Sequence, residues 1–99
     1  MIPLSAETID RVRTIFPTNE AQVSEYLEAQ CGATLPGVRA DDPQWHRLVQ
    51  RVRFAVLRTS NGDIDALKAA VERAHVDWRD TLVAAGFAES VDAHLTWSP

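Results

Sequence analysis

Residues 43–85 read PQWHRLVQRVRFAVLRT, then SNGD, then IDALKAAVERAHVDWRDTLVAA, and this stretch decides the fold. Both long runs carry apolar residues at helical spacing. Asp42 and Pro43 open the first run as an acidic N-cap followed by proline at the first helical position. The four residues 60–63 can supply a C-cap and the next N-cap. The sequence therefore predicts two long helices, over about 43–59 and 64–85, that pack as an antiparallel hairpin.

The second of these helices has the most regular apolar seam. Its members follow one another at spacings of three and four, as in a heptad repeat: Ile64, Leu67, Val71, Ala74, Trp78, Leu82 and Ala85. Gly86 is expected to end the helix, with Phe87 packing back on it. A short last helix is expected within 88–95.

N-terminal to the hairpin, the sequence predicts two shorter helices. Ser5 is the expected N-cap of the first, and Pro17 ends it. Thr18 or Asn19 can cap the second, and Gly32 is a natural stop after Cys31. β-type alternation is nowhere sustained. The predicted fold is all-α: a small helical bundle of four to five helices built around the antiparallel hairpin, as a single domain over 1–99.

Composition and charge argue against several classes of protein. Hydrophobic residues make up 45% of the chain and charged residues 24%, an ordinary globular balance that argues against disorder. The net charge of −4 argues weakly against binding of nucleic acid or an anionic membrane. The charge is uneven: residues 1–42 carry seven acids and three arginines, whereas residues 43–62 carry four arginines and no acid.

Cysteine usage and apolar runs bear on the expected compartment. Cys31 is the single cysteine, which fits a reducing cytosol. No signal peptide is expected at the N-terminus, and the longest apolar run, 82–88, is far too short to span a bilayer. A cytoplasmic protein without a cofactor is expected.

An arginine stripe on the helix over 43–59 is the main candidate for a binding surface. Arg47, Arg51 and Arg58 fall within about 40° of one another around the helix, and Phe54 and Leu57 lie on the same non-core side. Arginine and aromatic residues are enriched at interfaces, so the stripe could contact a protein partner or a second copy. It could also contact nucleic acid. Alternatively, the apolar pair is core and the arginines pair with acids of the same chain.

Candidates for catalysis are few. Cys31 and His75 have no catalytic or metal-ligating neighbours at helical spacing, and no known catalytic motif is present. Trp97 lies in an expected irregular segment, so it either docks back on the domain or contacts a partner. Trp45 and Trp78 are expected at the same end of the hairpin, where they could share one aromatic cluster. No catalytic or metal-binding residue is predicted.

Two segments carry a resemblance: NGDIDAL at 61–67 and DWRDTLVAAGFA at 77–88. Together they resemble a C-terminal pattern of short, uncharacterised bacterial proteins of about this length. The resemblance covers roughly the C-terminal half of the chain, and no catalytic motif comes with it. It implies a bacterial cytoplasmic protein and says nothing about mechanism.

These observations favour a non-enzymatic helical interaction or small regulatory module, which could form a homodimer. The predicted partner-binding residues are Arg47, Arg51, Phe54, Leu57, Arg58 and Trp97. Two alternatives stay open: a nucleic-acid-associated protein that uses the arginine stripe, and a small enzyme whose site forms between subunits.

Overall fold

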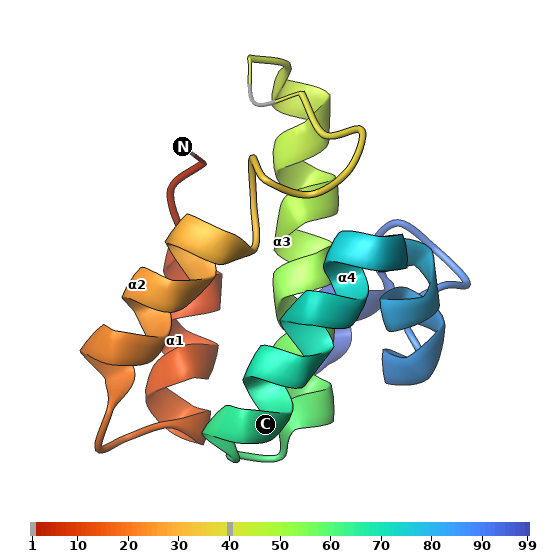
Figure 1. The fold of residues 1–99 in the computed structure, drawn as a ribbon. Helices are drawn as coiled ribbons and strands as arrows, with labels where there is room; N and C mark the ends of the chain where they lie inside the picture. Colours follow the sequence, from red (N-terminus) through yellow and green to blue (C-terminus); the bar gives the residue numbers. More distant parts are fainter. Residues whose placement is uncertain (1, 40) are drawn as a thin grey trace.

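The computed structural model describes residues 2–39 and 41–99 and consists of helices joined by loops (Figure 1). These are α1 (Ala6–Ile15), α2 (Glu20–Gln30), α3 (Pro43–Ser60), α4 (Ile64–Ala85) and a 3₁₀ helix, η1 (Ala93–Thr96). No strand occurs within the described residues. The predicted all-α bundle around an α3–α4 hairpin is confirmed.

The hairpin forms through the capping residues that the sequence offered. Asp42 accepts a hydrogen bond from the Gln44 amide at 3.0 Å, and Asp63 accepts one from the Asp65 amide at 2.9 Å. Asn61 ends α3 in the left-handed conformation, with φ 50°. A left-handed residue followed by a new N-cap reverses the chain within a few residues, so α4 returns along α3.

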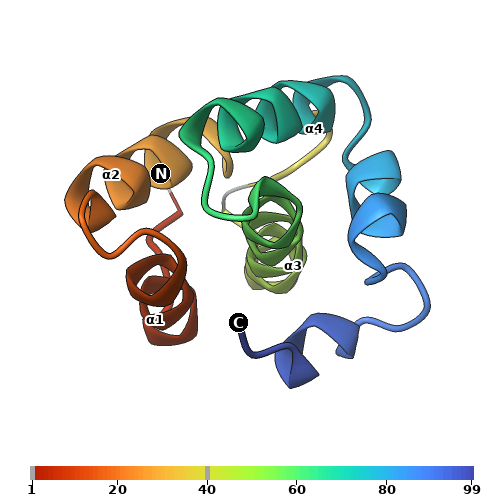
Figure 2. The same cartoon turned by 90° about the horizontal axis from the view of Figure 1, so that it is seen from below.

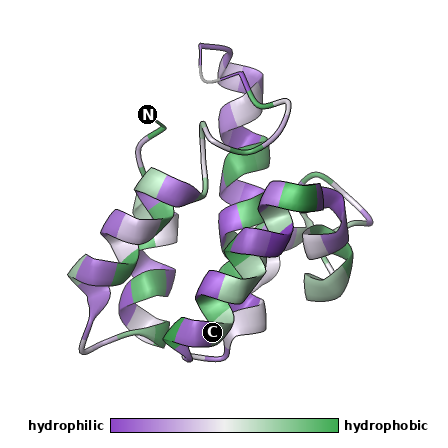
Figure 3. Ribbon diagram, viewed as in Figure 1, coloured by the Kyte–Doolittle hydropathy of each residue, from purple (hydrophilic) through white to green (hydrophobic). Residues whose placement is uncertain are grey.

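The core lies between these helices and is lined by one stripe of each. Figure 3 shows apolar and polar residues sharing every helix, as expected for helices that are buried on one side. Val12 of α1 and Phe16, the residue after α1, are buried, as are Val23 and Leu27 of α2. The buried apolar residues of the hairpin are Val49, Val52, Phe54, Ala55, Val56, Leu57, Leu67, Ala70, Val71, Ala74, Leu82 and Ala85.

α4 is not the continuous helix that the regular seam predicted. Asp77 has extended backbone angles (φ −156°, ψ 100°) inside it, and its side chain accepts a hydrogen bond from the Arg79 amide at 3.0 Å. Asp77 therefore acts as an N-cap that starts the last two turns in a new direction. Figure 2 shows these turns leaving the line of the first part of α4. At the bend, the Trp78 indole donates to the Pro36 carbonyl oxygen at 3.1 Å.

Gly32 follows the end of α2 as predicted, but for a different physical reason. The α2 C-cap is Cys31, with φ −126°, and Gly32 does not adopt the left-handed conformation of a helix stop. A Cβ atom on Gly32 would lie 2.7 Å from Nη2 of Arg53. Glycine is thus required here by the close approach of an α3 side chain.

Candidate functional site

The surface of α3 predicted to bind a partner is covered by the chain itself. Phe54 and Leu57 are both 0% exposed. The hypothesis of a partner surface around Arg51, Phe54 and Arg58 required both to be exposed, so in that form it is wrong. Residues 86–97 fold back over this side of α3, with η1 packed on it (Figure 2).

An aromatic cluster holds this C-terminal segment in place. The Phe54 ring meets the His94 ring edge-on at 5.0 Å and the Trp97 ring at 6.1 Å. Phe87 packs against Trp97, with ring centroids 6.0 Å apart. Trp97 therefore docks on the domain, the first of its two predicted alternatives. The expected cluster of Trp45 with Trp78 is wrong: within the described residues neither ring stacks on the other.

The arginine stripe fastens the same segment. Nε of Arg51 donates to the Phe87 carbonyl oxygen at 2.9 Å, and Arg58 lies over the Phe87 ring at 5.2 Å. Arg47, whose side chain is 80% exposed, only approaches Asp92 at 4.0 Å. The expectation that the stripe is intramolecular is met, but its partners are mostly a carbonyl oxygen and a ring. The predicted pairing with acids holds for Arg47 alone.

Arg11 of α1 completes the attachment from the opposite side. Its guanidinium donates to the Trp97 carbonyl oxygen at 3.2 and 3.0 Å and stacks 4.3 Å from the centre of the Phe54 ring. The segment is thus held by cations of two helices, and these cations are engaged within the chain.

Arg53 is the most important side chain that the sequence analysis missed. It is 2% exposed and donates to three carbonyl oxygens: Cys31 at 2.7 Å, Pro3 at 3.1 Å and Ile2 at 2.7 Å. These bonds tie the N-terminal residues and the end of α2 to α3. Burial lowers the pKa of Arg53. A signal for it existed, because position 53 is four residues after Val49 and falls within the apolar stripe.

A short polar chain runs from His94 to the start of α1. His94 Nε2 lies 3.0 Å from Oε1 of Gln50, and Gln50 donates to the Ser5 hydroxyl at 2.8 Å. Nδ1 of His94 is buried and has no hydrogen-bond partner among the residues that the structure describes. Burial lowers the pKa of His94, and nearby Arg51 lowers it further. The imidazole is therefore neutral near pH 7, with Nε2 as its protonated nitrogen.

The two candidate reactive groups, Cys31 and His75, both lie near the C-terminal end of α2. Cys31 is completely buried, and this burial raises its pKa to about 12. A thiol with such a pKa is a poor nucleophile at neutral pH. His75 is hydrogen-bonded through Nε2 to the Gln30 carbonyl oxygen. Both groups thus serve the junction between α2 and its neighbours.

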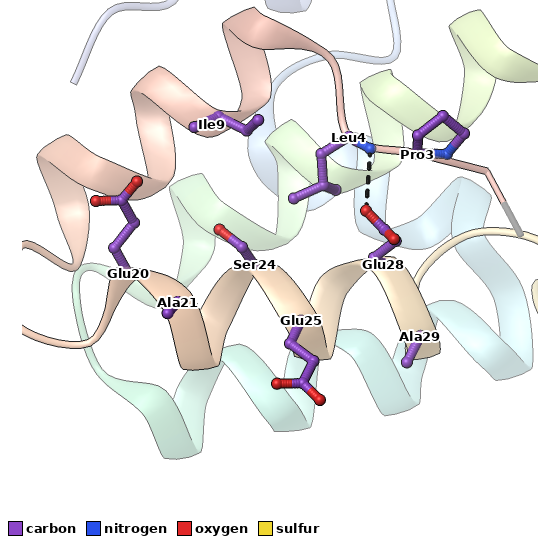
Figure 4. A pocket seen from close by; sticks show the side chains of 9 residues that line it. All are labelled: Pro3, Leu4, Ile9, Glu20, Ala21, Ser24, Glu25, Glu28 and Ala29. Atoms are coloured by element: carbon purple, nitrogen blue, oxygen red, sulfur yellow. Dashed lines mark hydrogen bonds between the residues drawn. The ribbon is translucent and has the colours of Figure 1, made fainter.

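A groove of about 770 Å³ lies between α1 and α2. Leu4 and Ile9 form its apolar wall on one side, and Ala21 and Ala29 leave room on the other. Figure 4 shows Glu20, Ser24 and Glu28 on the side of α2 that faces α1, whereas the Glu25 side chain points away from α1. The remaining lining residue is Pro3.

The charge of this α1–α2 groove is negative. Glu20, Glu25 and Glu28 line it, and none of its lining residues is basic. Glu20 is engaged by Arg13, whose Nη2 lies 3.2 Å away. Glu28 accepts a hydrogen bond from the Leu4 amide at 3.4 Å, which joins the two walls. Glu25 is exposed. The groove is thus apolar at its wall and acidic at its rim.

Two further recesses are smaller. One, of about 430 Å³, has a lining that includes Leu57, Arg58 and Trp97. The other, of about 280 Å³, has a lining that includes Ser5, Gln50 and Arg53. Over residues 2–39 and 41–99, no group of three or more histidine, cysteine or acidic residues could hold a metal ion. In the same residues, no helix has the length and apolar character needed to cross a membrane.

The sequence pattern did not predict the α1–α2 groove. Ala21, Ser24 and Ala29 are ordinary residues of a helix surface, and Ile9 lies only three residues before the buried Val12. Comparison of this chain with protein-family models, with curated proteins and with solved structures gave no match.

Proposed function

We propose that this chain is a non-enzymatic protein-interaction module and that its binding site is the α1–α2 groove. The observation that carries the proposal is the groove itself: a recess of about 770 Å³ whose apolar wall is not filled by any side chain within residues 2–39 and 41–99. Recesses of this size that combine apolar surface with a few polar groups are the usual place for a ligand.

The geometry favours a segment of another protein over a small molecule. α1 has ten residues and α2 has eleven, so the groove runs beside helices about 15 Å long. Such a length suits three turns of a partner helix laid between two helices. A small substrate would be better served by an enclosed site with a reactive group, and neither Cys31 nor His75 lines the groove.

A peptide-display selection on the immobilised protein tests the proposal. Random 16-residue peptides selected on the wild type are expected to lose at least about tenfold in affinity, or about 1.4 kcal/mol, for Ala21→Tyr. Ala29→Tyr should have the same effect, because both alanines are exposed and line the groove. The matched control is Ala84→Tyr on α4, also exposed.

Two results would overturn the proposal. One is a selection that yields no binder to the wild type. The other is a set of binders whose affinities are unchanged by both Ala21→Tyr and Ala29→Tyr, while circular dichroism shows that the variants are folded.

A further inference from the structure

We infer that the occupant of the α1–α2 groove is a cationic amphipathic helix of a partner protein. Its aliphatic side chains would lie on Leu4 and Ile9, and its lysine or arginine side chains would face Glu25 and Glu28. This inference rests on the proposed function, because it names the partner class for the same groove.

The charge distribution around the groove is the first argument. Glu20, Glu25 and Glu28 line it, and no basic residue is among the described residues that line it. Arg13 neutralises Glu20, so the carboxylates of Glu25 and Glu28 are the ones left for a partner. An acidic partner would be repelled on approach, whereas a cationic one would be attracted and oriented.

The polar contact of Glu28 is the second argument. Its Oε2 accepts one hydrogen bond, from the Leu4 amide, at 3.4 Å, which is long for a bond of this kind. A carboxylate has about four lone-pair positions, so Glu28 keeps most of its accepting capacity. A guanidinium or ammonium group arriving beside Leu4 could therefore bind Glu28 without breaking the bond that joins the two walls.

The apolar wall gives the third argument. Ile9 is half-buried and is not packed into the core, although Val12, one turn along α1, is 0% exposed. Leu4 is half-buried at the same end of the groove as Glu28. One or two aliphatic side chains of the partner would cover these residues and remove apolar surface from water.

A second copy of this chain is a poorer occupant on the same grounds. The net charge is −4 per chain, so two copies repel each other. The arginines of its most basic segment, 43–62, mostly make contacts within the chain. Arg51 and Arg53 donate to carbonyl oxygens, and Arg58 lies over the Phe87 ring. A separate cationic helix satisfies the groove without undoing these contacts.

Two synthetic helical peptides of 14 residues test the inference by fluorescence anisotropy. Both carry leucine at positions spaced three and four apart, with lysine at all other positions in one peptide and glutamate in the other. The lysine peptide is expected to bind the wild type at least about tenfold more tightly than the glutamate peptide. Its affinity should fall about tenfold for Glu25→Arg, and less for Glu28→Gln, which removes one charge.

Glu89→Arg is the matched control, because it makes the same change of charge at an exposed residue outside the groove. Less than a twofold loss with this variant shows that the peptide is not held by net charge alone. Ala21→Tyr should weaken the lysine peptide as strongly as it weakens the displayed binders.

Each other outcome overturns the inference. Equal affinity for the two peptides, no binding of either, or equal losses for Glu25→Arg and Glu89→Arg would each exclude a cationic partner in the groove. A molar mass of twice 11.0 kDa that Glu25→Arg returns to 11.0 kDa would identify a second copy as the occupant. The proposed function itself fails if the selection yields no binder to the wild type, or if the binders ignore both groove variants.

Discussion

The two sides of this molecule differ in what fills their recesses. On the α3 side, the C-terminal segment covers Phe54, and arginines of α1 and α3 fasten it. On the α1–α2 side, no segment within residues 2–39 and 41–99 fills the groove beside Leu4 and Ile9. This difference shows that residues that stand out in the sequence need not form a binding surface. Here the arginines and aromatics serve the fold, and inconspicuous alanines line the open groove.

Removing an aromatic ring from the α3 side should have the largest effect on the free energy of unfolding. Phe54→Ala should lower the free energy of unfolding by about 4 kcal/mol, because a 0% exposed ring leaves a cavity. Urea denaturation measures it. The midpoint should not depend on protein concentration, whereas a subunit interface would make it do so. Leu95→Ala, at a residue 45% exposed, is the control and should change little.

Arg53 should come next. Arg53→Met leaves the carbonyl oxygens of Ile2, Pro3 and Cys31 without their donor, so a loss of about 3 kcal/mol is expected in urea denaturation. Arg47→Met makes the same chemical change at a side chain that is 80% exposed and should cost less than about 0.5 kcal/mol. Equal losses for the two variants would contradict the role given to Arg53.

Gly32→Ala should have a smaller effect, of about 1–2 kcal/mol, since the new Cβ must displace the Arg53 guanidinium. The cost should nearly vanish in the Arg53→Met background, because the crowding atom is then gone. A double-mutant cycle measures this coupling. A cost that persists in the absence of Arg53 would mean that the backbone, and not the close approach, requires glycine.

The pH dependence of the free energy of unfolding should reveal the contribution of His94. Its pKa in the folded protein lies below the ordinary 6.5, owing to burial first, then to Arg51, with Arg11 and Arg47 adding to the effect and Asp92 opposing it. The unfolded chain therefore takes up a proton more readily, so the His94 contribution is complete above pH 6.5 and is lost as the pH falls below it. Unfolding followed from pH 7.5 to 5 should show this loss, and His94→Gln should reduce it. Identical pH profiles would assign the loss to other groups.

The smallest effect on stability is expected on the open side. Ala21→Tyr and Glu25→Arg change exposed residues, so the free energy of unfolding should stay within about 0.5 kcal/mol of the wild type. Both variants should nevertheless lose binding to a groove ligand. A large destabilisation by either would mean that the groove belongs to the packed structure and not to a binding surface.

The fold could be predicted from the sequence where local signals agree. The caps at Ser5, Asp42 and Asp63 are present as expected, and the apolar spacing placed α3 and α4 nearly to the residue. The bend at Asp77 was missed because its neighbours keep the apolar seam in register. An aspartate can cap a helix inside such a seam, and spacing alone does not reveal which choice the chain makes.

The groove could not be predicted in this way. Whether Ile9 enters the core or faces a groove depends on how α1 and α2 cross each other, which is a property of tertiary packing. The same holds for Phe54, since its burial requires a segment some forty residues further along the chain. By contrast, Arg53 could have been found, because a cation within an apolar stripe already calls for buried acceptors.

The bend at Asp77 has a consequence for how the domain opens. A helix interrupted by an extended residue is no longer one hydrogen-bonded ladder, so its two parts need not unfold together. The last two turns of α4 lead directly into the segment that covers Phe54. Amide hydrogens of residues 78–97 should therefore exchange with solvent as one unit, earlier than those of 64–76. The cover over the aromatic cluster is in this sense a hinged end of the protein and not part of its most protected core.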